Sequence, residues 1–211
     1  MIKHLIKYCY ILIILNLYSI TGFASVSHGP YVGIELGGSK QTFNFNSSIF
    51  SLDTNGGNLT NSELGAVARF NLGYSLDKYN SFELGASYNF AFNYTYPNNQ
   101  GSTLNNLWSQ DITYILTLPT IVDKLAILGR VGLAYDWTHA NSCCCQIGDA
   151  SVNTFSDVFG AGISYKLSSK SIIRVEWVSN GLFFPIGVNS GDTNIGSLTS
   201  NNFELGLNYY F

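Results

Sequence analysis

Apolar and polar residues alternate along eight stretches of the chain, and the segments between these stretches keep no regular alternation. In each stretch one parity is apolar, and the other is polar or rich in glycine. A period of two residues predicts a β-strand, because successive side chains of a strand point to opposite faces of the sheet. The expected strands are residues 31–39, 64–74, 81–92, 107–118, 125–137, 154–167, 171–180 and 203–211.

The segments between these strands are alternately long and short. The long ones, rich in Asn, Ser, Thr and Gly, are residues 40–63, 93–106, 138–153 and 181–200, and the short ones are 75–80, 119–124 and 168–170. Long extracellular loops that alternate with short periplasmic turns are typical of small membrane barrels. The pattern therefore predicts an all-β fold: an eight-stranded antiparallel up-and-down transmembrane β-barrel with four long extracellular loops and three short periplasmic turns.

Charged residues make up only 11% of the chain, and their positions indicate which face of each strand meets lipid. Nine of them fall on the polar parity, whereas the apolar parity carries none in the strand centres. A Lys or Arg that faces lipid at mid-depth costs about 2–4 kcal/mol, so the charged face is expected to line the interior. Eight strands enclose a space that side chains can fill, and we expect these charges to pair there as a plug. The expected interior charge network is Glu35, Arg69, Glu83, Asp111, Arg130, Lys166, Arg174, Glu176 and Glu204.

The start of the chain has the pattern of a secretory signal peptide. Lys3 and Lys7 precede an apolar run at residues 8–18, and Gly22-Phe23-Ala24 forms a cleavage site with small residues at its first and third positions. The expected domains are a signal peptide at residues 1–24 and an outer-membrane barrel at residues 25–211. A retained anchor is the alternative, which the short apolar run disfavours. Without the signal peptide, eight Lys and Arg stand against 13 Asp and Glu, and this balance argues against nucleic acid as a partner.

The last expected strand ends the chain on an aromatic residue. One of its parities is wholly apolar and consists of Phe203, Leu205, Leu207, Tyr209 and Phe211. This stretch resembles the C-terminal strand of bacterial outer-membrane β-barrels, which the barrel-assembly machinery reads as an assembly signal.

With segments 31–37 and 174–177, this ending makes the chain from residue 25 onward similar to the small eight-stranded outer-membrane barrels. These include the opacity-type adhesins and the transmembrane part of outer-membrane protein A. The resemblance implies a place in the outer membrane of a Gram-negative bacterium, contact with its lipid and lipopolysaccharide, and insertion by the barrel-assembly machinery.

Some small outer-membrane barrels modify lipid acyl chains with a Ser, a His and an acid near the rim. His139 is followed by Ser142 and Asp149, so a nucleophile, a base and an acid could meet there. The His-x-Ser spacing of the deacylase barrels is absent, because Ala140 and Asn141 follow His139. We therefore interpret His139 as an ordinary loop histidine and expect no catalytic residues.

Three consecutive cysteines, Cys143, Cys144 and Cys145, fall in the same long segment. Zinc sites usually space their ligands by two or more residues, so the run is not expected to hold a metal. Adjacent cysteines also cannot join distant strands. Four interpretations remain open: a strained bond within the run, a link to another chain, acylation, and a run of thiols that is merely tolerated. No cofactor is expected.

The last long segment carries an apolar run that is a candidate contact surface, made of Leu182, Phe183, Phe184 and Ile186. A loop folded back over the barrel mouth is the alternative interpretation. The sequence thus predicts a non-enzymatic outer-membrane surface protein, a scaffold that presents extracellular loops for adhesion or for interaction with a host or the environment. A narrow porin-like channel for small solutes is the alternative function, and a lipid A-modifying enzyme is a weaker one.

Overall fold

The computed structural model of this chain describes residues 28–45, 60–90, 92–95, 101–122, 124–142, 150–190 and 193–211. No helix within these residues is long and apolar enough to cross a membrane. The described strands are β1 (Gly29–Phe45), β2 (Thr60–Ser75), β3 (Asn80–Asn89), β4 (Phe92–Thr95), β5 (Gly101–Pro119), β6 (Leu125–Ser142), β7 (Ala150–Lys166), β8 (Ser171–Asn180), β9 (Ile186–Ser190) and β10 (Thr193–Tyr210). The predicted signal peptide lies outside the described residues.

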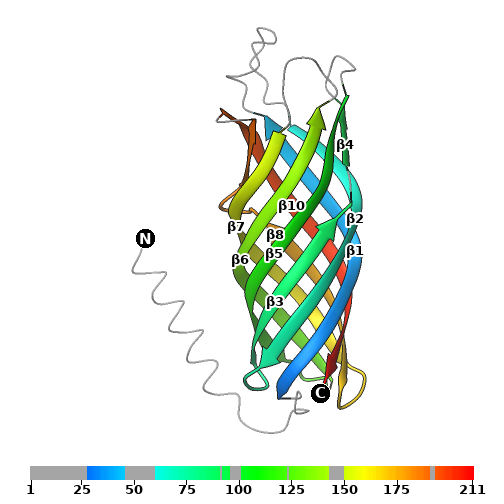
Figure 1. Ribbon diagram of the computed structural model, residues 1–211. Coiled ribbons are helices and arrows are strands. Elements are labelled where there is room, and N and C mark those ends of the chain that lie inside the picture. Colours follow the sequence, from blue (N-terminus) through cyan, green and yellow to red (C-terminus); the bar gives the residue numbers. More distant parts are fainter. Residues whose placement is uncertain are drawn as a thin grey trace, which may run out of the picture.

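The strands form one antiparallel sheet that closes into a barrel (Figure 1). Strand β1 pairs with β2 on one side and with β10 on the other, so the first and last strands complete the circle. Strands β3 and β4 both pair with β5, and β8 and β9 both pair with β7 and β10. Each of these two couples occupies one position in the wall. The barrel therefore has eight strand positions, and the predicted eight-stranded antiparallel barrel is confirmed.

Three short connections lie at one end of the barrel, together with the start of β1 and the C-terminus (Figure 1). We call this the turn end and the opposite end the loop end. In the first connection, Asp77 accepts hydrogen bonds of 2.7 Å from the backbone N–H groups of Tyr79 and Asn80. Burial raises the pKa of Asp77, but the hydrogen bonds from the Asn80 side chain and from these N–H groups outweigh burial and hold the pKa below its usual value.

The strands continue farther toward the loop end than the alternation predicted. Strand β1 runs to Phe45 and β2 begins at Thr60, so both enter the segment 40–63 that we predicted as a loop. Strands β5, β6, β7 and β10 extend in the same direction. Beyond the bilayer the outward face meets water and carries polar residues such as Lys40, while the inward Gln41 is polar and buried, so the extensions lack an apolar parity although the backbone ladder continues. The predicted loop boundaries at this end were therefore wrong.

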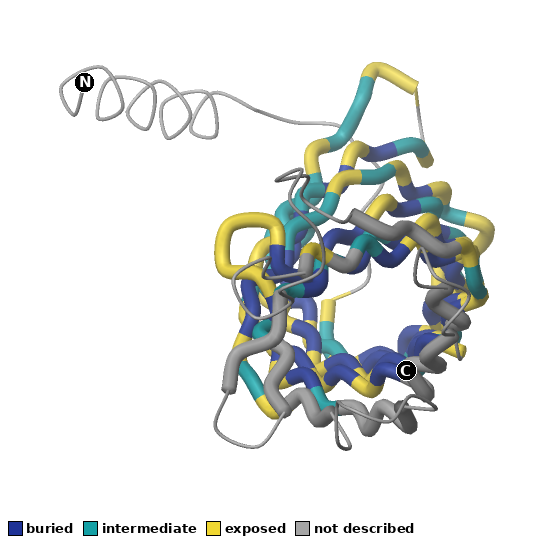
Figure 2. Tube along the Cα trace, turned by 90° about the horizontal axis from the view of Figure 1, so that it is seen from above, coloured by how far each residue is buried: buried dark blue, intermediate teal, exposed yellow. Residues whose placement is uncertain are grey.

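Buried and exposed residues alternate along the strands of the wall (Figure 2). In β3, for example, Glu83 and Ser87 are buried while Leu84 is exposed. The exterior carries exposed large apolar side chains on every side, including Ile34, Leu36, Phe70, Leu84, Ile112, Leu133, Ile163, Leu205 and Leu207. A continuous apolar exterior around a polar interior is the arrangement of a barrel that spans a lipid bilayer.

Aromatic side chains on the exterior gather in two bands. The loop-end band contains Tyr88, Phe90, Trp108, Tyr135, Trp137 and Phe155, whose contacting rings have centroids between 4.5 and 6.1 Å apart. The turn-end band contains Tyr74, Phe82, Tyr114, Tyr165, Tyr209 and Phe211. Such bands mark the two interfaces of a membrane, so the segment between them is the membrane-spanning part of the wall.

Residues 181–185, here called the lateral bulge, leave the wall between β8 and β9. Figure 1 shows this segment as an orange loop beside the barrel. Gly181 begins it with a φ of 77°, which glycine adopts without strain. The ring of Phe183 then packs against the outward-facing Phe159, with centroids 5.0 Å apart. The bulge therefore lies against the outer wall and does not fold back over the barrel mouth.

Candidate functional site

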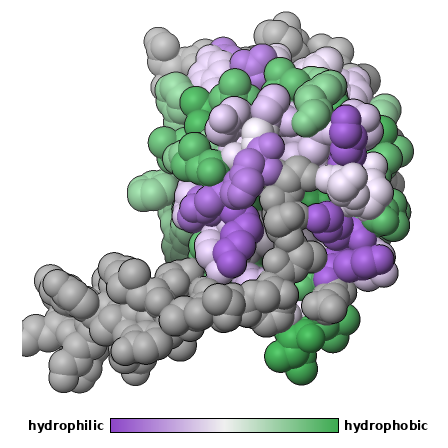
Figure 3. Space-filling model, turned by 90° about the horizontal axis from the view of Figure 1, so that it is seen from below, coloured by the Kyte–Doolittle hydropathy of each residue, from purple (hydrophilic) through white to green (hydrophobic). Residues whose placement is uncertain are grey.

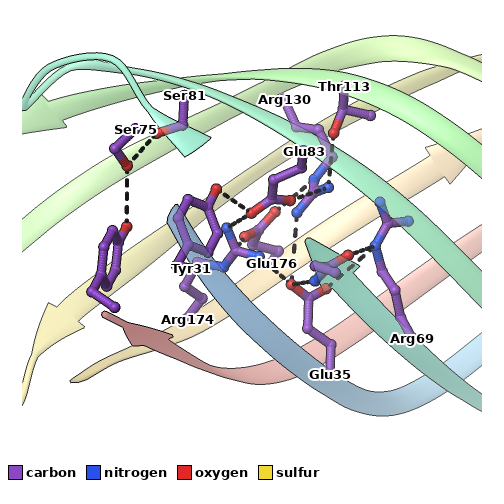
Figure 4. A network of polar contacts seen from close by, with 12 residues as sticks. Tyr31, Glu35, Arg69, Ser75, Ser81, Glu83, Thr113, Arg130, Arg174 and Glu176 are labelled. Carbon is purple, nitrogen blue, oxygen red and sulfur yellow. Dashed lines mark hydrogen bonds and ion pairs between the residues drawn. The ribbon is translucent and has the colours of Figure 1, made fainter. Parts of the chain in front are cut away.

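The interior of the barrel contains a buried cluster of charged side chains that come from strands on different sides of the wall (Figure 4). Strand β1 contributes Glu35, β3 contributes Glu83, β6 contributes Arg130, and β8 contributes Arg174 and Glu176. All five occupy the inward parity of their strands, where the sequence pattern predicted charged residues. The closed wall brings them together although up to 141 positions separate them, from residue 35 to residue 176.

Two arginines link the carboxylates of this cluster. Arg174 donates from Nη1 to Glu83 Oε1 at 2.5 Å and pairs through Nη2 with Glu35. Its Nε lies 2.9 Å from Glu176 Oε1.

Arg130 repeats this arrangement from β6, which β7 separates from β8. Its Nη1 lies 2.9 Å from Glu83 Oε2, and its Nε donates to Glu176 Oε2 at 3.0 Å. A third contact of 3.7 Å joins its Nη2 to Glu35 Oε1. Glu83 and Glu176 thus each lie between two guanidinium groups, and the ion pairs cross the barrel from wall to wall.

A second group lies beside the first and extends it toward β2 and β5. Arg69 Nη2 donates to Asp111 Oδ1 at 2.5 Å, and Arg69 Nε donates to Asn71 Oδ1 at 2.7 Å. Asn71 in turn donates to Glu35 Oε1 at 2.7 Å, so Glu35 connects the two groups. The seven ion-paired side chains are at most 4% exposed, and solvent therefore has almost no access to this level of the barrel.

Glycines on the neighbouring strands make room for these long side chains. A Cβ atom on Gly85 would lie 2.3 Å from Arg69 Nη2 and 2.6 Å from Asp111 Oδ2. A Cβ atom on Gly162 would lie 2.7 Å from Glu176 Cγ and 2.3 Å from the carbonyl oxygen of Val175. All four distances are shorter than a Cβ contact allows, so a side chain at Gly85 would displace the ends of the Arg69 and Asp111 side chains, and one at Gly162 would collide with the Val175 backbone.

Apolar and hydroxyl-bearing side chains close the interior at the turn end. The rings of Tyr31 and Tyr210 have centroids 4.7 Å apart and pack with Ile172. The Tyr31 hydroxyl donates to Glu83 Oε1 at 2.7 Å, which joins this layer to the charged cluster. Ser75 and Ser81 complete the layer through hydroxyl contacts (Figure 4).

Two predicted members of the charge network are not among these seven ion-paired side chains. Lys166 is half-buried at the turn end of β7, where its backbone N–H donates to the backbone carbonyl oxygen of Lys124. Glu204 is 1% exposed and faces the interior, opposite Glu176 of β8 and Gly37 of β1. The structure therefore places Glu204 beside the cluster and Lys166 outside it.

Two buried carboxylates were missing from the predicted network. Asp136 is fully buried in the interior and accepts hydrogen bonds from the Ser109 and Ser156 hydroxyls. Its parity, shared with Arg130, could have identified it. Asp157 lies on the outward parity, under the lateral bulge, and accepts hydrogen bonds of 3.1 and 2.5 Å from the N–H groups of Phe183 and Phe184. No local pattern in the sequence predicts this contact.

The candidate contact surface is only partly exposed. Leu182 is half-exposed, and Phe183 and Phe184 are 66% and 68% exposed on the lateral bulge. Ile186 is fully buried and belongs to β9, so it is not available as a contact. The five apolar residues of the expected assembly signal all face outward on β10 and just after it.

The alternative catalytic group falls largely outside the described residues. Asp149 and the three cysteines are not described, and of His139 and Ser142 only the backbone in β6 is. In that strand, His139 lies opposite Asn105 of β5 and Ser151 of β7. Within the described part of the chain, no three His, Cys, Asp or Glu side chains are grouped so that they could hold a metal ion.

Comparison with known proteins supports the architecture. Residues 11–211 match the family described as outer membrane protein beta-barrel domain. Among solved structures, Neisserial surface protein A has a TM-score of 0.59 at 18% identity, covering 87% of this chain and 97% of its own. OprG from Pseudomonas aeruginosa has a TM-score of 0.54 at 9% identity, covering 90% and 99%. No curated protein matches this chain.

Proposed function

We propose a function from the premise that this chain belongs to the outer membrane protein beta-barrel family. It is a non-enzymatic surface scaffold. It holds its long connections at the cell exterior for adhesion or for contact with a host or the environment. The observation that carries this proposal is the charged cluster across the interior. Side chains from β1, β3, β6 and β8 meet there with an exposure of 4% or less. A barrel filled in this way offers solutes no path at that level, so the functional surface is assigned to its exterior.

The length of the strands supports a role at the cell surface. A tilted strand needs roughly 9 to 11 residues to cross a bilayer. Strands β1, β2, β5, β6, β7 and β10 contain 16 to 19 residues. Because they continue past the loop-end aromatic band, the wall forms a hydrogen-bonded rim beyond the membrane. A rigid rim holds binding segments in place at a low cost in conformational entropy.

The alternative function, a narrow channel, is tested by single-channel conductance of the refolded protein in a planar bilayer. We expect the native barrel to be silent. Replacing both partners of one ion pair by a small residue, with Glu83→Ala and Arg174→Ala, should open a conducting path, because both side chains that cross the interior are shortened.

The matched control is Glu83→Gln with Arg174→Gln, which removes the same two charges but keeps most of the side-chain volume. This variant should remain silent, because volume and not charge closes the path. Steady conductance of the native barrel would instead make transport its function.

We assign the exposed side chains of the lateral bulge to contacts with the outer leaflet. Phe183 packs on Phe159, which shares the outward parity of β7 with Phe155 of the loop-end aromatic band, and Phe184 follows it as an exposed ring. Exposed aromatic side chains near the edge of a bilayer meet lipid head groups. Lipid and lipopolysaccharide are the partners that this position favours. The host or surface ligand of the scaffold is assigned to the rim and its connections.

The C-terminal strand remains the proposed assembly signal, read after export through the predicted signal peptide. The rings of Phe211 and Tyr209 have centroids 5.7 Å apart, and Phe211 is exposed on the outside of the barrel. Phe211→Ala should therefore lower the amount of barrel inserted in cells several-fold while leaving the stability of refolded protein nearly unchanged. Quantitative immunoblots of outer membranes, with Tyr74→Ala from the same aromatic band as control, measure this effect. Equal losses for both variants would remove the signal role of Phe211.

A further inference from the structure

Carboxyl groups outnumber guanidinium groups at the level of the charged cluster, counted over the described residues. Four carboxylates pair there with three guanidinium groups: Glu35, Glu83, Asp111 and Glu176 with Arg69, Arg130 and Arg174. Glu204 adds a fifth carboxyl group, because it faces the interior opposite Glu176 of β8. If all five were ionised, this level would carry two negative charges in excess, and an uncompensated charge in a protein interior is very costly.

Glu204 differs from the other four carboxyl groups in its contacts. It is 1% exposed and forms no ion pair with the arginines of the described wall. Neither of its oxygens accepts a hydrogen bond from an N–H or O–H group of the described residues. A buried carboxylate without donors takes up a proton instead of keeping its charge.

The neighbour with which Glu204 can share a proton is Glu35, on the adjacent strand. In the register of β1 and β10, Glu35 lies opposite Gly206, and Glu204 lies opposite Gly37. The Glu35 side chain leans over Gly206, where a Cβ atom would lie 2.6 Å from Glu35 Cγ. The two carboxyl groups come within hydrogen-bonding distance of each other there. Carboxylate oxygens only accept, so a hydrogen bond between them needs a proton on one of the two.

Glu35 has one oxygen available for that proton. Its Oε1 accepts hydrogen bonds from Asn71 and Arg174, whereas its Oε2 accepts none from the described residues. Three arginines surround Glu35 and stabilise its negative charge. The proton therefore resides on Glu204, and Glu35 Oε2 is its acceptor.

The other charged groups around Glu204 do not replace this proton. Strand β8 brings Glu176 opposite Glu204 and Arg174 opposite Gly206, and Arg69 and Arg130 face it from β2 and β6. The arginines attract a charge on Glu204, but they are already paired with the other carboxylates, and Glu35 and Glu176 repel it. Strand β9, which also pairs with β10, contains no charged residue.

Packed side chains separate this carboxyl pair from the water at the turn end. Figure 3 shows that end, where strongly hydrophilic side chains lie beside hydrophobic ones. Between it and the charged cluster, Tyr31, Tyr210 and Ile172 form a layer that is at most 7% exposed. Water thus has little access with which to solvate a second charge at Glu204.

We propose that the interior binds one proton between Glu204 and Glu35, where the first and last strands close the barrel. Glu204 carries the proton and donates a hydrogen bond to Glu35 Oε2. The proton is taken up from water during folding, because an exposed glutamate is ionised above about pH 4.3. Four carboxylates then remain at this level, each paired with an arginine. The proposal concerns the interior and is independent of the role assigned to the loop end.

Infrared spectroscopy of the full barrel refolded in lipid vesicles tests this proposal, because a protonated carboxyl group has a carbonyl band that a carboxylate lacks. The native spectrum at neutral pH minus that of Glu204→Gln should contain one such band. The matched control is Glu176→Gln, which removes an ion-paired carboxyl group opposite Glu204 and should leave the band in place. The band should also persist in Asp136→Asn, which assigns it to the glutamate pair even if Glu204→Gln does not fold.

The proton also links stability to pH. The folded native barrel holds a proton that the unfolded chain releases, so native stability should fall as the pH rises, whereas Glu204→Gln keeps an amide donor at every pH. The unfolding constant of the native barrel relative to that of Glu204→Gln should therefore rise about tenfold between about pH 6 and about pH 7. Urea unfolding in vesicles measures both constants.

A native spectrum without the acid band, or a band that Glu204→Gln leaves in place, would overturn the proposal. A ratio of unfolding constants that does not change with pH would do the same. Higher native stability in sodium or potassium than in choline, at constant ionic strength, would assign an alkali ion to the carboxyl pair in place of the proton. A heat-dependent shift on SDS gels verifies that each variant is folded.

Discussion

Arg174→Gln is expected to destabilise the barrel by about 3–5 kcal/mol. The native guanidinium pairs with Glu35, Glu83 and Glu176, all of which are buried. Without it, Glu83 and Glu176 share Arg130 alone, and Glu35 keeps only its longer contacts of 3.9 Å with Arg69 and 3.7 Å with Arg130, so the carboxylates are left with too little compensating charge. Urea unfolding of barrels refolded in lipid vesicles, followed by tryptophan fluorescence, measures the change.

The double variant Arg174→Gln with Glu83→Gln separates charge from packing. It removes one charge of each sign, so we expect it to recover more than half of the stability that Arg174→Gln loses. Lys170→Gln serves as the surface control and should change stability by less than about 1 kcal/mol, because an exposed charge is screened by water. A loss for Arg174→Gln no larger than for Lys170→Gln would mean that the interior cluster contributes little to stability.

Ile112→Arg, on the opposite face of the wall, should cost about 2–4 kcal/mol in the same vesicles. Ile112 is 64% exposed and lies between Leu84 of β3 and Leu133 of β6, which are exposed as well. Its place between the two aromatic bands puts it near the bilayer centre, where a guanidinium has no water and no partner. The apolar replacement Ile112→Leu should leave stability within about 1 kcal/mol of the native value.

Ile112→Arg and Arg174→Gln together test which face of the wall contacts hydrocarbon and which face accommodates charge. A soluble barrel would tolerate Arg at position 112, because that side chain would project into water. If Ile112→Arg is as stable as Ile112→Leu, the apolar exterior does not contact hydrocarbon and the membrane assignment of this face fails. If both Ile112→Arg and Arg174→Gln lose stability, charge is required inside and excluded outside.

The parity of the strands could be predicted from the sequence alone. A pleated strand with lipid on one face and a filled interior on the other must alternate, so Leu84 and Ile112 were readable as outward and Glu83 and Arg130 as inward. The number of strand positions followed from counting such stretches. The predicted loop boundaries failed because the outward face is no longer apolar above the membrane, so polar residues such as Lys40 and Gln41 occupy both parities there.

Local patterns could not predict the partners within the interior. Arg69 and Glu83 stand on neighbouring strands, yet Arg69 pairs with Asp111 while Glu83 pairs with the two arginines from β6 and β8. The stagger of the closed wall decides which inward side chains share a level, and that stagger is a property of all the strands together.

The sequence by itself therefore determined the eight strand positions, their faces and the placement of charge in the interior, since each depends on neighbours one or two residues away. Only the tertiary structure decided the ion pairs, the covering of Asp157 by the lateral bulge, and the meeting of Glu35 and Glu204 where the first and last strands pair. The physical reason is barrel closure, which brings residues far apart in the chain to one level and so sets the contacts that no local period can encode.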